Sequence, residues 1–247
     1  MKVEEITPYG DPAESKTGQV RHMFDNIAPA YDTLNRAMTL GMDRLWRRKA
    51  VSLLSPASAY PKVLDVATGT ADIAIRLARA NATPSITGID LSEGMLAIGR
   101  RKVAEAKLPP EVKIELRQAD CLHSGLADGE FDGVICAYGV RNFADIRAGL
   151  REMHRITRPG GALVILELST PASPLVRPFY NFYTHRVIPL MGRFVSGDSN
   201  AYTYLPQSVA AVPQGSRMTD LILEAGYREA RAISLCMGVS TIYHATK

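Results

Sequence analysis

A regular alternation of apolar runs with longer helical segments is the feature that most constrains how this 247-residue chain folds. Most of the apolar runs lack a polar face, which is typical of parallel strands that helices cover on both sides. The pattern therefore predicts a doubly wound, Rossmann-like α/β sheet that binds its ligand at the carboxyl ends of the strands. We expect strands at residues 62–67, 85–91, 112–119, 131–137 and 162–168, and helices at 71–81, 92–106 and 145–157.

The N-terminal part precedes this alternation. Residues 18–56 show apolar side chains at helical spacing, broken at Pro29 and Gly41, and we expect a helical cap of two or three helices there. Residues 1–17 are polar and irregular, and we expect them to be flexible. Residues 18–247 would then form a single domain.

The C-terminal part completes the sheet. Residues 173–195 and 218–225 are helical in pattern. Two final strands, near 228–235 and 240–246, bring the expected sheet to seven strands.

Composition limits the kinds of partner. A net charge of +4 tolerates anionic ligands or a membrane surface, but without a basic block interleaved with aromatic residues it does not predict nucleic-acid binding. The three cysteines lie far apart and the five histidines show no metal-ligand spacing, so we expect neither a disulfide framework nor a metal. The N-terminus has no apolar stretch and no apolar run reaches about 18 residues, so we expect a cytoplasmic protein.

The turn that follows the first strand is the first candidate for a ligand site. Asp65 lies near the end of the strand, and Gly69 lets the backbone approach a ligand at the start of the next helix. The turn lacks the three glycines of a dinucleotide site, which argues against a nicotinamide cofactor. A tight turn with no ligand is the alternative at this point.

The next two strands also end in acids. Asp90, which closes the second strand, suits the two hydroxyls of a ribose, or it helps Ser92 to cap the following helix. Asp120, beside Cys121 after the third strand, suits the amino group of an adenine, or it is a solvated acid. Together with the glycine turn, these acids predict a site for an adenosyl group without phosphate, and an acidic rim suits the sulfonium of S-adenosylmethionine.

Longer segments from residue 20 to residue 247 resemble the UbiE/COQ5 family of quinone C-methyltransferases. The glycine turn and the Pro-Gly-Gly strand are common to many methyltransferases, whereas the runs around Tyr31–Trp46, Val140–Asn142 and Ala201–Val209 are more particular to this family. The segments are FDNIAPAYDTLNRAMTLGMDRLWR (24–47), VLDVATGTAD (63–72), ICAYGVRNFAD (135–145), RITRPGGALVILELSTP (155–171) and PLMGRFVSGDSNAYTYLPQSV (189–209).

The resemblance implies a class I S-adenosylmethionine-dependent methyltransferase fold and a set of cofactor-binding residues. That set comprises Asp65, Gly69, Thr70, Asp90, Leu91, Asp120 and Cys121. The sequence departs from the family pattern at Ala137, where a serine is common, and at Ala71, Asp43 and Thr39. These departures put a hydroxyl contact at position 137 and any role for position 43 in doubt.

The resemblance also implies methyl transfer to a ring carbon of a prenylated quinol. We expect demethylmenaquinol as the substrate, with a ubiquinone precursor as the alternative. Arg141 would stabilise phenolate charge, Asn142 would orient the hydroxyl or a water, and Tyr31 would contact the same group. The alternative is an ion pair from Arg141 to Asp145, with Tyr31 as packing.

Aromatic and arginine side chains alternate through residues 175–195, including Arg193 and Phe194. Such a stretch fits a lid over the site or contact with lipid headgroups at the inner face of the membrane, or a helix that faces the core. A homodimer stays open. Two other functions stay open as well: methylation of another small molecule, and a non-catalytic scaffold that binds S-adenosylmethionine.

Overall fold

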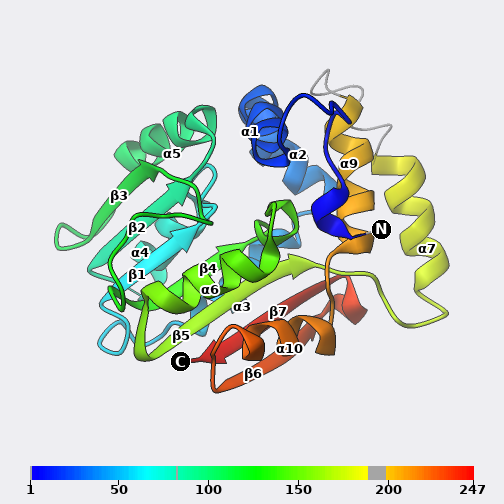
Figure 1. The fold of residues 1–247 in the computed structure, drawn as a ribbon. Helices are drawn as coiled ribbons and strands as arrows, with labels where there is room; N and C mark the ends of the chain where they lie inside the picture. Colours follow the sequence, from blue (N-terminus) through cyan, green and yellow to red (C-terminus); the bar gives the residue numbers. More distant parts are fainter. Residues whose placement is uncertain (1, 82, 189–198) are drawn as a thin grey trace.

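The computed structural model describes residues 2–81, 83–188 and 199–247. Its centre is a seven-stranded sheet in the order β3-β2-β1-β4-β5-β7-β6 (Figure 1). The strands β1 to β5 are parallel, and β7 pairs antiparallel with β5 and β6. The Rossmann-like seven-stranded sheet expected from the sequence is therefore confirmed. The strands are β1 (Lys62–Val66), β2 (Ser85–Asp90), β3 (Lys113–Gln118), β4 (Phe131–Ala137), β5 (Thr157–Leu168), β6 (Glu229–Leu235) and β7 (Ser240–Thr246).

Helices cover both faces of the sheet. Neighbouring residues of β5 show this: Leu163 packs in a buried cluster with α6 (Ile146–Ile156) and α10 (Ser216–Glu224), and Val164 packs in another with α3 (Asp43–Ser52) and α4 (Asp72–Asn81). Burial on both faces explains why β5 reads as a continuous apolar run.

Two helices on the sheet begin with a side-chain cap. The Ser92 hydroxyl accepts a hydrogen bond from the Met95 N–H at the start of α5 (Glu93–Glu105), as expected, and Asp145 accepts one from Ala148 N at the start of α6. The order of the strands reverses between β1 and β4, which are neighbours in the sheet but not in sequence. A crevice at the carboxyl ends of these two strands is where open α/β sheets bind ligands.

The carboxyl ends of the strands are covered by a helical cap. Figure 1 shows α1 (Lys16–Ile27), α2 (Tyr31–Met38), α7 (Arg177–Phe182) and α9 (Ser199–Ala211) gathered at the end toward which β4 and β5 point. Met23, Leu34, Met95 and Tyr204 share a buried cluster that joins α1, α2 and α9 to α5.

The helix α7 continues as a π-helical turn, Tyr183–Val187. The expected helix over 173–195 is thus present from Arg177, while Arg193 and Phe194 lie outside the described residues. The helix α9 was not expected, because Pro206 interrupts the helical pattern of its sequence.

The N-terminal segment differs from the expectation of a flexible tail. Val3 and Ile6 are 1% and 5% exposed, and the Lys16 ammonium donates to the Val3 carbonyl. Val3 belongs to the same buried cluster as α6. Two isolated apolar residues in a polar stretch produce no periodic pattern, so sequence alone gave no reason to place this segment against the domain.

Candidate active site

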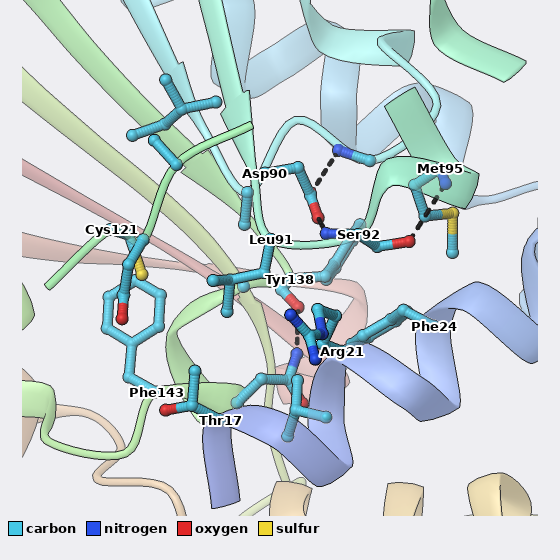
Figure 2. A pocket seen from close by; sticks show the side chains of 18 of the residues that line it. Thr17, Arg21, Phe24, Asp90, Leu91, Ser92, Met95, Cys121, Tyr138 and Phe143 are labelled. Carbon is cyan, nitrogen blue, oxygen red and sulfur yellow. Dashed lines mark hydrogen bonds between the residues drawn. The ribbon is translucent and has the colours of Figure 1, made fainter. Parts of the chain in front are cut away.

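A cavity opens where the carboxyl ends of β1, β2 and β4 meet α1. Figure 2 shows Thr17, Arg21 and Phe24 of α1 on one side and Asp90 with Leu91 after β2 on another. The cavity encloses about 710 Å³, part of it open to solvent, which lies in the range of small-molecule sites. We call it the polar cavity.

Asp90 and Gly69 form one wall of the polar cavity. The Asp90 carboxylate accepts hydrogen bonds from Gly69 N at 2.8 Å and from Ser92 N at 2.9 Å (Figure 2). Gly69 has φ +55°, a conformation that favours glycine, and no atom lies within 4 Å of where its side chain would begin. The carboxylate is thereby fixed at the cavity wall, and each of its oxygens keeps a lone pair for a further donor.

Asp120, Cys121 and Leu91 also line the polar cavity, with Phe143 beside them. Asp120 Oδ1 accepts a hydrogen bond from Leu122 N at 2.8 Å. Burial, followed by the charges of Asp120 and Asp90, raises the pKa of the Cys121 thiol, so this side chain is neutral. The wall therefore combines a carboxylate with uncharged side chains.

Two of the expected cofactor residues lie behind the cavity rather than on its wall. Asp65 is 1% exposed and accepts a hydrogen bond from the Thr68 hydroxyl at 2.6 Å. The Thr70 hydroxyl donates to Asp32 Oδ1 at 2.8 Å and accepts from Lys102 Nζ at 3.0 Å. A cofactor contact by Thr70 would require an exchange of these hydrogen bonds.

We expect the buried Asp65 to make stability depend on pH. Burial raises its pKa to about 7, against the opposing hydrogen bond from Thr68. The unfolded chain releases this proton near pH 3.9 and the folded chain only near pH 7, so the carboxyl destabilises the fold increasingly as pH rises between these values. In urea unfolding, the free energy of unfolding of Asp65→Asn minus that of the unsubstituted protein should be about 2–3 kcal/mol larger at pH 8 than at pH 5. An identical difference at both pH values would contradict the raised pKa.

Arg141 forms its ion pair with Glu167, and not with Asp145, the partner considered from the sequence. Its Nη1 donates to Glu167 Oε1 at 2.7 Å and to the Tyr138 carbonyl at 2.6 Å, while its backbone N–H donates to Glu167 Oε2 at 3.2 Å. Asp145 instead caps α6. Burial alone would lower the pKa of Arg141, but Glu167, Tyr31 and Tyr204 raise it, so the guanidinium is a fixed positive charge.

Asn142 is held between the sheet and the cap. Its Nδ2 donates to the Tyr138 carbonyl at 3.3 Å, and its Oδ1 accepts from the Tyr204 hydroxyl at 3.2 Å. The side chain borders the polar cavity. The fixed orientation suits a residue that positions a hydroxyl group.

A second, larger cavity adjoins the first beneath α2, α3, α7 and α9. It encloses about 1390 Å³, part of it open to solvent, and its walls are mainly apolar. We call it the apolar cavity. Tyr31 and Tyr138 line both cavities, and Arg141 lines the apolar one. Among the side chains that line it are Met38, Trp46, Leu168, Tyr183 and Val209.

Sequence reasoning missed several of these side chains. Glu167 is an acid inside an otherwise apolar strand, and that exception was a readable signal of a buried ion pair. Tyr138 has φ +61° at the end of β4, which nothing in the sequence indicates. Arg21 reaches the polar cavity from α1 and was indistinguishable from a solvated helix residue.

Neither a metal nor a membrane span is evident in residues 2–81, 83–188 and 199–247. No group of three or more His, Cys, Asp or Glu side chains there is arranged to hold a metal ion. No helix in the same residues has the length and apolar character needed to cross a bilayer.

Comparison with known proteins gives a consistent set of relatives. A model of the ubiE/COQ5 methyltransferase family matches residues 12–247. A demethylmenaquinone methyltransferase of Porphyromonas gingivalis is 47% identical over 99% of this chain and 98% of its own length. A protein of Geobacter sulfurreducens named ubiquinone/menaquinone biosynthesis C-methyltransferase is 43% identical over 94% of this chain and 90% of its own.

Solved structures agree on the fold. An S-adenosylmethionine-dependent methyltransferase of Thermotoga maritima superposes with a TM-score of 0.63 at 17% identity, covering 92% of this chain and 99% of the other. An S-adenosylmethionine-dependent methyltransferase of Aquifex aeolicus superposes with a TM-score of 0.58 at 17% identity, covering 81% of this chain and 88% of the other. At such identities the likeness supports the fold alone.

Proposed function

The chain belongs to the ubiE/COQ5 methyltransferase family, and from that premise we propose that it methylates a ring carbon of demethylmenaquinol with S-adenosylmethionine as the methyl donor. The observation that carries this proposal is the pairing of two cavities. A polar cavity with a fixed carboxylate meets an apolar one at Tyr31 and Tyr138. A charged donor and a prenylated ring can therefore meet at that junction.

The residues of the polar cavity fit an adenosyl group. The free lone pairs of Asp90 would accept the two ribose hydroxyls. Asp120 would accept from the adenine amino group, with Cys121 and Leu91 against the ring. Arg21, a cation at the same cavity, would meet the carboxylate of the methionine part. When bound, the cofactor supplies an electrophilic methyl group.

The ring carbon must become nucleophilic before it can take the methyl group. Loss of the proton from the adjacent hydroxyl pushes electron density onto the carbon, which forms a bond to the methyl as the bond from methyl to sulfur breaks and its electron pair stays on sulfur. The carbon then loses its own proton, the ring regains aromaticity, and the phenolate oxygen takes a proton back. The products are menaquinol, S-adenosylhomocysteine and one proton.

Arg141 and Asn142 would support this step. The guanidinium carries its charge beside the apolar cavity and would stabilise the phenolate. An arginine paired with Glu167 is a poor proton acceptor, so a water molecule oriented by Asn142 would take the hydroxyl proton. Tyr31, at the junction, would hold the ring in line with the methyl group.

The proposal is tested with purified protein, S-adenosylmethionine labelled with ¹³C in the methyl group, and short-chain demethylmenaquinol kept reduced without oxygen. We expect a labelled methyl group on the unsubstituted carbon of the quinol ring, detected by mass spectrometry and NMR. A ubiquinone precursor in parallel reactions reports which ring is preferred. Absence of label in both quinols would contradict the proposal.

The rim of the apolar cavity supports contact with a membrane surface. Five large apolar side chains are between 66% and 81% exposed. They are Leu40, Leu175, Phe179, Phe182 and Met237. They lie on the α2–α3 turn, on α7 and just before it, and on the turn before β7, and Leu40, Phe179 and Met237 among them line the apolar cavity. An exposed apolar rim around an apolar cavity fits a protein that rests on lipid headgroups and receives a prenylated substrate from them.

We expect the double substitution Phe179→Ser and Phe182→Ser to weaken binding to phosphatidylglycerol/phosphatidylethanolamine vesicles at least tenfold, because it removes two side chains that would leave water. Leu223→Ser on α10, where the leucine is 42% exposed, is the matched control and should change binding less than twofold. Co-sedimentation measures both. Equal effects of the two changes would place the contact elsewhere.

A further inference from the structure

A second buried charge, besides Arg141, lies in the wall of the apolar cavity. Arg47 of α3 is 7% exposed and lines this cavity. Its Nε lies 3.5 Å from Asp43 Oδ2, and within the described part of the chain this Nε makes no hydrogen bond. Arg47 is thus a cation with an unused buried donor beside an apolar space.

A second polar group accompanies it. The Tyr138 hydroxyl is buried near the Ser240 side chain, and among the described residues it makes no hydrogen bond of good geometry. The Arg47 guanidinium carbon lies 5.2 Å from the centre of the Tyr138 ring. Buried donors without hydrogen-bond partners are costly. Both the Arg47 Nε and the Tyr138 hydroxyl are covered by their neighbours, so a polar ligand group in this cavity would reach them through a small rotation of the two side chains.

The two arginines of the cavity contact different parts of Tyr138. Arg141 Nη1 donates to the Tyr138 carbonyl at 2.6 Å, and the Arg47 guanidinium lies over the Tyr138 ring. Burial alone would lower the pKa of Arg47, but Tyr138, Tyr31, Asp72 and Asp43 raise it. A flat ring that packs beside Tyr138 would therefore have two cations in the wall of the same cavity.

We propose that Arg47, together with the Tyr138 hydroxyl, binds the second oxygen of the quinol, the one next to the prenylated carbon. Arg141 and Asn142 take the first oxygen, next to the carbon that is methylated. The inference rests on the proposed function and deepens it, because it makes the enzyme selective for a ring with two oxygens on opposite sides. Asp43 keeps the Arg47 side chain in place from the neighbouring turn of α3.

The test compares two substrates that differ by this one oxygen. 2-Prenyl-1,4-naphthalenediol carries both hydroxyls, and 3-prenyl-1-naphthol keeps the prenyl group and the hydroxyl beside the reacting carbon but lacks the other. We expect Tyr138→Phe and Arg47→Lys each to lower kcat/KM for the diol about tenfold, mainly through KM, and to change it less than twofold for the mono-ol. The affinity for S-adenosylhomocysteine should stay unchanged.

Matched controls are Arg48→Lys, next to Arg47 on the exposed face of α3, and Tyr227→Phe, a buried tyrosine near Thr157. Both control variants should have the same kcat/KM as the unsubstituted protein on the diol and on the mono-ol. If the mono-ol is bound without turnover, its inhibition constant against the diol replaces the rate.

Equal losses on diol and mono-ol in the Arg47 and Tyr138 variants would overturn this inference and leave the methyl transfer intact. An unsubstituted protein that methylates neither compound would overturn both.

Discussion

Replacing Arg141 with alanine is expected to lower kcat for quinol methylation by about 10²–10³-fold, the typical cost of removing one donor to a developing oxyanion. The guanidinium is buried beside the apolar cavity and held by Glu167 at 2.7 Å, so no solvent cation can replace it. The affinity for S-adenosylmethionine should change less than twofold, since Arg141 does not line the polar cavity. Steady-state kinetics and isothermal titration measure the two effects.

A control must separate chemistry from folding. Arg141→Ala leaves the buried Glu167 without its partner, which costs about 3–5 kcal/mol of stability. The pair Arg141→Met with Glu167→Gln removes both charges and should recover stability, measured by urea unfolding, without recovering turnover. If Arg141→Ala keeps full activity, the phenolate is stabilised elsewhere. If cellular quinone methylation is also unchanged, a scaffold becomes the better description.

Asp90→Ala is expected to weaken the binding of S-adenosylmethionine by about 2–3 kcal/mol, or roughly 30- to 150-fold, through the loss of two charge-assisted hydrogen bonds. Asp90→Asn is the matched variant. It keeps one acceptor for Gly69 or Ser92 and should fall between alanine and the unsubstituted protein. Isothermal titration measures the affinity, and thermal unfolding checks that the turn after β1 is intact. Equal affinity in all three proteins would refute the assignment of Asp90.

Much of the sheet was readable from sequence because burial on both faces leaves a simple signal. β4 and β5 are mainly apolar in their buried parts, apart from Asp132 and Glu167. β4 has its expected bounds, and β5 ends where expected but begins earlier, at Thr157. Asp90 was readable for a similar reason, since an acid directly after a buried strand stands out. Its place at the cavity wall follows from the parallel order of the strands.

The features that the sequence did not predict depend on contacts between segments that are distant along the chain. Glu167 became the partner of Arg141 because β5 lies next to β4 in the sheet, whereas Asp145 was only near in sequence. The position of Thr70 depends on Asp32 and Lys102, from two other helices. Helix α9 forms despite Pro206 because the cap packs against it through Tyr204. Periodicity describes a segment alone and carries none of this information.

The polar cavity is proposed to hold an adenosyl sulfonium with its methyl group turned toward the apolar cavity. A crystal structure with S-adenosylhomocysteine is the sharpest test. We expect the ribose hydroxyls on Asp90, the adenine between Leu91 and Cys121, and the sulfur facing the junction of Tyr31 and Tyr138. A nucleoside bound elsewhere, or a sulfur pointing away from that junction at full occupancy, would contradict it.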